Sequence, residues 1–326
     1  MSAKSSPIAA RVFAVLLLVG LALVPPLAAW LDQPFWVTLF TRILIFALAA
    51  MGLNLVLGFG AMVSFGHAMY LGLGAYVVGI LSYHGMDNGF VQLLVALALG
   101  AGVALAVGAI CLRTSGMAFI MITLAFAQML YFLAVSLREY GGDDGMQLKS
   151  RSQFGALDLD NPTALYYLAF ALVLAVLFAF WRLVHARFGM VLRGCRSNPR
   201  RMASMGFPTL RYRLSAYVIS ALVCVLAGML MANLTRFVAP SYMAWTVSGE
   251  LIVMTVLGGL GTLIGPIAGA AALLLLEEGL SSLHLGVPWL DKTINEHWLA
   301  LIGIFIVLVV LVLKQGIYGW LVARKA

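Results

Sequence analysis

Few residues of this 326-residue chain have the type and spacing that catalysis requires. Ser64 and His67 are close enough in sequence to act as a nucleophile and its base, but no nearby acid is evident to orient the histidine. The five histidines are scattered, which does not fit a metal site, and no Gly-x-x-x-x-Gly-Lys-Ser/Thr loop is present to bind ATP. We therefore expect no catalytic residue, no metal and no cofactor bound by this chain, and we interpret His67 as a hydrogen-bonded packing residue.

Two glycine-rich segments interrupt apolar sequence. The first runs from Gly52 to Ala75 and contains Asn54, Ser64 and His67. Backbone that leaves a helix at membrane depth must be surrounded by protein or by a water-filled cavity, and glycines permit such a break. The segment predicts either a broken or re-entrant region beside a pathway, or close helix packing through small residues. The same two interpretations apply to a second glycine cluster, which consists of Gly258, Gly259 and Gly261.

Other polar side chains also lie within apolar runs. Thr123 and Gln128 are interpreted as interhelical hydrogen-bonding residues rather than substrate contacts. Glu250 is costly if it faces lipid, so it either lies at the outer interface, which we favour, or faces a cavity. Arg42 either extends to the outer headgroups or is a charge within the membrane.

Membrane-spanning helices must position these residues. Hydrophobic residues make up 63% of the chain, charged residues 10%, and the mean hydropathy is +1.04. This composition predicts an all-α polytopic membrane protein, with residues 1–326 forming one transmembrane domain. We expect about ten helices, several short or broken by glycine, because residues 248–280 are long enough to cross twice. The single spans are expected at 12–30, 35–57, 67–83, 90–112, 117–137, 164–184, 214–234 and 297–313.

The loop over residues 185–213 is strongly basic. Between Trp181 and Leu214 there are eight arginines and no Asp or Glu. Basic loops resist translocation, so this loop and both termini are expected in the cytoplasm, as is the turn at the second glycine cluster. The net charge of +8 therefore reflects topology, not nucleic-acid binding.

The basic loop contains the signals of a very short helix. Asn198 is its N-cap, Pro199 its first residue and Gly206 its left-handed end. So short a helix is marginal alone in water, so it must pack against something. Met202 and Met205 are expected on one side of it, in a form suited to a groove on a partner protein. Attraction of the basic loop to anionic lipid is the alternative.

Residues 138–163 form the longest external loop, which is acidic around Gly141 to Gly145. A tight polar turn is favoured over a docking surface for an external protein.

Several motifs, in the same order, resemble those of the LivM-type permeases of branched-chain amino acid ABC importers. They cover residues 52–76, 123–129, 141–145 and 252–266. The resemblance implies a fold similar to the larger-permease (type II) importers, in a bacterial inner membrane. It also implies a second, paralogous permease subunit, two ATPase subunits that carry Mg-ATP, and a periplasmic amino-acid-binding protein.

The resemblance further implies that the basic loop couples the chain to the ATPase subunits. The expected coupling residues are Arg193, Arg196, Asn198, Pro199, Arg200, Arg201, Met202, Ala203, Met205 and Gly206. Family members commonly carry glutamates where this chain has Ser197 and Pro199. Candidate residues of the pathway are Asn54, Ser64, His67, Thr123, Gln128, Glu250, Gly258, Gly259 and Gly261. The alternatives are a urea or short-amide importer of the same family and a stand-alone channel or secondary carrier.

Overall fold

The computed structural model describes residues 7–155, 159–281, 300, 302–308, 311 and 316–323. The expected last span, 297–313, lies mostly outside these residues. The helices are α1 (Pro7–Ala22), α2 (Val24–Trp30), α3 (Pro34–Asn54), the π-helix η1 (Leu55–Phe59), α4 (His67–Tyr83), α5 (Gly89–Cys111), α6 (Met117–Ser136), the 3-10 helix η2 (Arg138–Tyr140), α7 (Pro162–His185), α8 (Arg187–Ser197), α9 (Pro199–Ser204), α10 (Thr209–Thr235), the 3-10 helix η3 (Pro240–Met243), α11 (Trp245–Gly258), α12 (Gly265–Ser281) and α14 (Gly316–Ala323).

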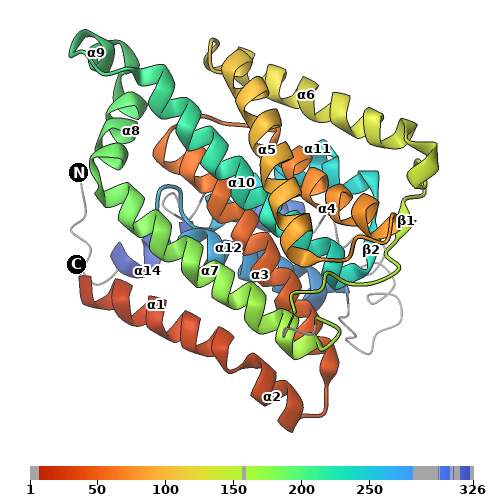
Figure 1. Cartoon of the computed structure of the whole chain (residues 1–326). Coiled ribbons are helices and arrows are strands. Elements are labelled where there is room, and N and C mark those ends of the chain that lie inside the picture. Colours follow the sequence, from red (N-terminus) through yellow and green to blue (C-terminus); the bar gives the residue numbers. More distant parts are fainter. Residues whose placement is uncertain are drawn as a thin grey trace.

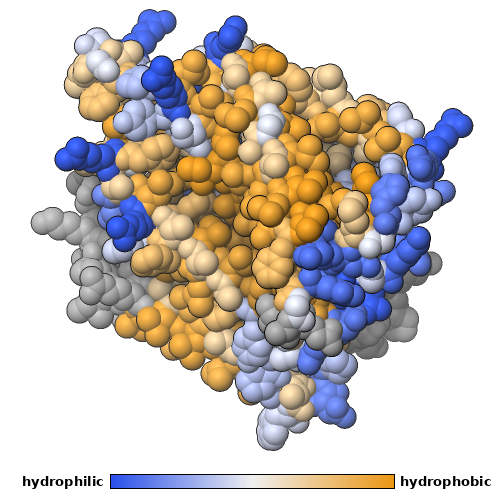
Figure 2. Space-filling view, in the orientation of Figure 1, coloured by the Kyte–Doolittle hydropathy of each residue, from blue (hydrophilic) through white to orange (hydrophobic). Residues whose placement is uncertain are grey.

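The chain is an all-α polytopic membrane protein, as expected. Among the described residues, five helices are long and apolar enough to cross a membrane, or six if the bent pair α1–α2 is one span. Helices α4 and α11 are apolar but shorter. Figure 2 shows hydrophilic residues gathered around α8 and α9 and, across the molecule, beside the β-strands, with an apolar band between them. Such a band is the surface that hydrocarbon requires.

Helix α3 forms the centre of the molecule, and α7, α10, α11 and α12 pack around it (Figure 1). Helix α4 packs mainly against α10. In the continuous apolar stretch Pro34–Phe59, which joins α3 and η1, the most apolar part is 94% buried inside the chain. Small residues allow the neighbouring helices to approach closely, which compensates for the absence of a hydrophobic driving force within lipid. A Cβ atom on Gly228 of α10 would lie 1.8 Å from the Leu71 carbonyl oxygen, and one on Gly74 of α4 would lie 2.1 Å from that of Val225. Close packing by small residues is therefore confirmed where α4 crosses α10.

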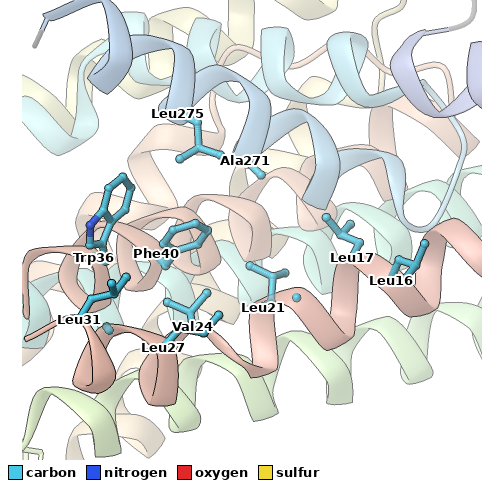
Figure 3. A pocket seen from close by; sticks show the side chains of 12 residues that line it. Leu16, Leu17, Leu21, Val24, Leu27, Leu31, Trp36, Phe40, Ala271 and Leu275 are labelled. Carbon is cyan, nitrogen blue, oxygen red and sulfur yellow. The ribbon is translucent and has the colours of Figure 1, made fainter. Parts of the chain in front are cut away.

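A proline pair bends the first span by 44° between α1 and α2. Pro25 has no amide hydrogen, so the Leu21 carbonyl loses its partner four residues on. The buried Tyr166 hydroxyl of α7 donates a hydrogen bond to this carbonyl. The bend also opens an apolar groove of about 460 Å³ towards α3 and α12, lined by residues such as Leu21, Phe40 and Leu275 (Figure 3). This lining offers hydrocarbon contact and no chemistry.

A short β-ladder, not expected from the sequence, joins the loop after α6 to the end of α10. Strand β1 (Met146–Gln147) pairs antiparallel with β2 (Phe237–Val238). Gly141, Gly142 and Gly145 have positive φ angles, which confirms the tight turn ahead of β1. The two elements are too short for a strand pattern to show in the sequence.

Both described ends of the chain lie near the basic loop. In Figure 1, α14 and the start of α1 lie at the same end of the molecule as α8, opposite the β-ladder. A groove of about 510 Å³ is lined there by Ala14 of α1, Arg193 of α8, Thr262 and Tyr318 of α14. We call this the loop end and the opposite side the ladder end.

Candidate functional site

Helix α3 is interrupted beyond Asn54. The π-helix η1 follows over Leu55–Phe59, residues 60–66 are not helical, and α4 starts at His67. Ala61 has a φ of 51°, a left-handed conformation that costs energy for a residue with a Cβ atom. The predicted break in the glycine-rich segment is thus present, and we call residues 55–66 the first break.

Helices α11 and α12 are separated by a second break, residues 259–264. Gly259 and Gly261 have φ angles of 122° and 74°, which favour glycine. A Cβ atom on Gly258 would lie 1.8 Å from the Gly265 carbonyl oxygen, so the two helix ends approach too closely for any side chain. The glycine cluster thus allows a hairpin of two short helices.

The Asn54 side chain connects the two breaks. Its Nδ2 donates a 2.7 Å hydrogen bond to the Thr262 carbonyl, and its Oδ1 accepts a 3.0 Å bond from the Gly261 amide. The side chain therefore supplies partners for one backbone carbonyl and one backbone amide of the second break, where no helix satisfies them. We call this pair of hydrogen bonds the Asn54 bridge. A Cβ atom on Gly58 would lie 2.1 Å from Asn54 Oδ1, so only glycine leaves room for the bridge.

Helix α8 of the basic loop also contacts the first break. The Arg196 guanidinium donates a hydrogen bond to the Gly58 carbonyl. Arg193, one turn earlier, donates instead to the Gly189 and Val184 carbonyls, at 3.3 Å each, and so joins α8 to the end of α7. The basic loop is thus bonded directly to backbone within the membrane part of the chain.

His67 lies at the start of α4 and is fully buried. Its Nδ1 lies 3.0 Å from Ser64 Oγ, and its Nε2 lies 2.8 Å from Ser220 Oγ of α10. The rings of Tyr70 and Tyr217 meet the imidazole edge-on, with centroids 6.0 and 5.6 Å away. Both ring nitrogens have partners, as the packing interpretation requires. In the described part of the chain, no group of three His, Cys, Asp or Glu side chains could hold a metal ion.

Two side-chain hydroxyl groups bond to backbone amides on either side of His67. Thr123 Oγ1 of α6 accepts a 3.2 Å bond from the Phe65 amide and donates to the Ile120 carbonyl at 2.9 Å. Ser248 Oγ of α11 accepts a 3.0 Å bond from the Ala68 amide near the start of α4. Thr123 thus joins α6 to the first break, rather than to a second helix. Gln128 is half-buried on the same helix and lies outside this network.

Glu250 lies apart from the Asn54 bridge, near the ladder end of α11. Its side chain is exposed, and the charges of Glu277 on α12 and Arg42 on α3 act on it. Arg42 is exposed too, with its guanidinium carbon 5.7 Å from the centre of the Phe46 ring. The structure thus groups three charged residues of distant sequence positions.

The short helix in the basic loop is present as α9. Asn198 Oδ1 accepts a 3.0 Å bond from the Arg201 amide, and Gly206 has a φ of 87°. The structure corrects one expectation, because the two methionines do not share an exposed side. Met202 is buried against Val191, Cys195 and Tyr212 within the chain, and it supplies the packing that so short a helix needs.

Met205, by contrast, is 57% exposed. The expected coupling residues that remain exposed on or beside α9 are Asn198, Pro199, Arg200, Arg201, Ala203, Met205 and Gly206.

Comparison with known proteins bears on this architecture. The sequence profile of the family described as "Branched-chain amino acid transport system / permease component" matches residues 35–310, which include both breaks and the basic loop. The chain belongs to this family. Membership of this family accounts for the polytopic architecture.

Two relatives show the extent of the similarity. The high-affinity branched-chain amino acid transport system permease protein LivM of Escherichia coli K12 is 26% identical over 301 residues, covering 85% of this chain and 68% of LivM. The corresponding LivH protein of the same organism is 25% identical over 294 residues, covering 84% of this chain and 91% of LivH. No solved structure matches the chain.

Proposed function

We propose that this chain is one of two paralogous permease subunits of an ABC importer for branched-chain or related hydrophobic amino acids. Its partners would be the second permease, two cytoplasmic ATPase subunits that hold Mg-ATP, and a periplasmic amino-acid-binding protein in a bacterial inner membrane. Family membership and the similarity to LivM and LivH support this proposal. With the basic loop in the cytoplasm, both termini and the second break face the same compartment.

The observation that carries the proposal is a series of hydrogen bonds that connects the basic loop to the two breaks. Arg196 of α8 bonds to Gly58 in the first break, and the Asn54 bridge joins the first break to the second. A displacement of α8 by an ATPase therefore acts on both breaks at once. Coupling between distant sites needs a physically connected element with two arrangements, and the two breaks supply flexible joints for one.

The pathway would be formed between the two permease subunits beside these breaks, with the binding protein as the main source of selectivity. The buried polar groups around Asn54 and His67 bond to each other, so few remain to hold a substrate tightly. We expect the purified permease complex, without binding protein, to bind leucine no more tightly than about millimolar, or about 4 kcal/mol. A micromolar Kd, measured by calorimetry and lost in Asn54→Ala or His67→Ala, would contradict this expectation.

The coupling surface can be tested with the two methionines of α9. Met205→Asp places a charge on the exposed surface and should reduce co-purification of the ATPase subunits and uptake into proteoliposomes, with permease yield and melting temperature unchanged. Met202→Asp puts a charge into a buried cluster and should lower the stability of the permease itself. If Met205→Asp retains the ATPase as the wild type does, α9 is not the contact.

A further inference from the structure

A small cavity lies beneath the basic loop, next to α9. Its volume is about 190 Å³, and its walls come from five parts of the chain. Residues 60–63 of the first break and the residues around Ser115 at the start of α6 form two of them. Cys195 and Arg196 of α8, Pro199 of α9 and Arg213 of α10 complete the lining. We call this space the Arg213 cavity.

Two guanidinium groups line the Arg213 cavity, and none of its described lining residues is acidic. Arg196 uses one nitrogen for the Gly58 carbonyl, and a guanidinium has further N–H groups to donate. Arg213 Nε donates to the Met62 thioether sulfur at 3.3 Å, which is a weak acceptor. Arg213 is half-buried, and a cation away from water is costly unless it is paired with an anion.

The location of the cavity indicates which molecule could supply an anion to pair with Arg213. Its rim includes Pro199, the first residue of α9, so it adjoins the surface that would meet an ATPase subunit. The sequence from Trp181 to Leu214 contains no acid of its own. An acidic side chain of a protein seated on α9 would therefore have the complementary charge. A carboxylate also matches the planar guanidinium fork in geometry.

We propose that the Arg213 cavity receives an Asp or Glu side chain of the ATPase subunit, which pairs with Arg213 and Arg196. This inference rests on the proposed function and adds an acidic anchor to the coupling contact. The same anchor would link the ATPase to the first break. Met62 of that break lines the cavity, and Arg196, which also lines it, bonds to Gly58 of the same break.

The test uses the permease pair in nanodiscs of phosphatidylcholine alone, titrated with ATPase subunits. Arg213→Gln should raise the Kd at least about tenfold. The matched control is Arg211→Gln, which removes the same charge from an exposed position on the same helix turn and should change the Kd less than about twofold. Permease melting temperatures are measured for both variants, and Arg213→Lys, which keeps the charge, should recover part of the affinity.

A second measurement identifies the partner group. In the Arg213→Lys complex a carbodiimide should join the new amine to the ATPase carboxylate, and mass spectrometry would locate the acid. Arg211→Lys is the control for random linkage. Equal effects of the 211 and 213 variants in both measurements would overturn the anchor. The titration is repeated in nanodiscs that contain an anionic lipid, and an Arg213→Gln effect seen only there would also overturn the anchor and assign the cavity to a lipid phosphate. If the wild type binds no ATPase, the proposed function itself fails.

Discussion

Asn54 replaces hydrogen-bonding partners that interrupted helices have lost. In Asn54→Leu, which has a similar volume, the Thr262 carbonyl and the Gly261 amide lose their partner. We expect a loss of about 1–3 kcal/mol for each group left unsatisfied, measured by unfolding in detergent. ATPase binding should persist while transport falls, because the path from α8 to the second break is cut.

Gln128→Leu is the control, since it removes a half-buried amide that lies outside the Asn54 bridge. If both variants have the same stability, the bridge does not hold the two breaks together.

Gly58 is the other residue on which the bridge depends. A Cβ atom there would lie 2.1 Å from Asn54 Oδ1 and 2.4 Å from the Gly261 amide nitrogen. Gly58→Ala should therefore destabilise the chain by about 1–3 kcal/mol through overpacking. Gly102→Ala on α5, where nothing lies within 4 Å, should be neutral or slightly stabilising because alanine favours helix. Thermal unfolding of the two alanine variants compares them directly, and equal melting temperatures would contradict the close contact.

At the scale of elements, the bend between α1 and α2 and the second break each have another side chain that bonds to the backbone groups left free. The bend between α1 and α2 depends on Tyr166, whose hydroxyl donates to the Leu21 carbonyl. Tyr166→Phe should destabilise the chain by about 1–3 kcal/mol, because a buried carbonyl loses its donor. Tyr167→Phe, at a residue 43% exposed on the same helix, is the matched control and should have little effect. A stable Tyr166→Phe protein would show that the carbonyl finds another donor.

At the scale of the whole molecule, the loop end and the ladder end should face opposite sides of the membrane. A cysteine at position 200 on α9 should react with an impermeant maleimide only from the cytoplasm, and one at position 143 only from outside. Labelling of both positions from one side in intact cells would overturn the orientation.

The native cysteines should react little in this labelling experiment. Cys111, Cys195 and Cys224 are all buried. Burial raises the pKa of the Cys195 thiol, although the nearby Arg213 charge acts in the opposite direction. Its thiolate is therefore scarce at neutral pH, and alkylation should become faster only as the pH rises towards that pKa. Rapid modification of Cys195 at pH 7, followed by mass spectrometry, would contradict its burial.

The sequence by itself determined the class of protein, the apolar helices α3 to α7 and α10, the basic loop and the capping of α9. These features depend on composition and on neighbouring residues, which act through hydrophobic length and local hydrogen bonds. It also located both breaks, because clustered glycines within an apolar run permit the backbone to leave the helix. The motifs at residues 52–76 and 252–266 carried the family resemblance that the comparisons support.

Only the tertiary structure decided which of these features touch. Asn54 and Gly261 are 207 positions apart, and Arg196 and Gly58 are 138 apart, so no local pattern could pair them. Met202 was predicted to contact a partner, because helical spacing shows which side of α9 it lies on. The spacing does not show that other residues of the chain pack against that side. The partners of His67 and the grouping of Glu250 with Arg42 depend likewise on how α3, α4, α10 and α11 pack. Packing follows from the summed shapes of many side chains, which the order of residues along one helix does not reveal.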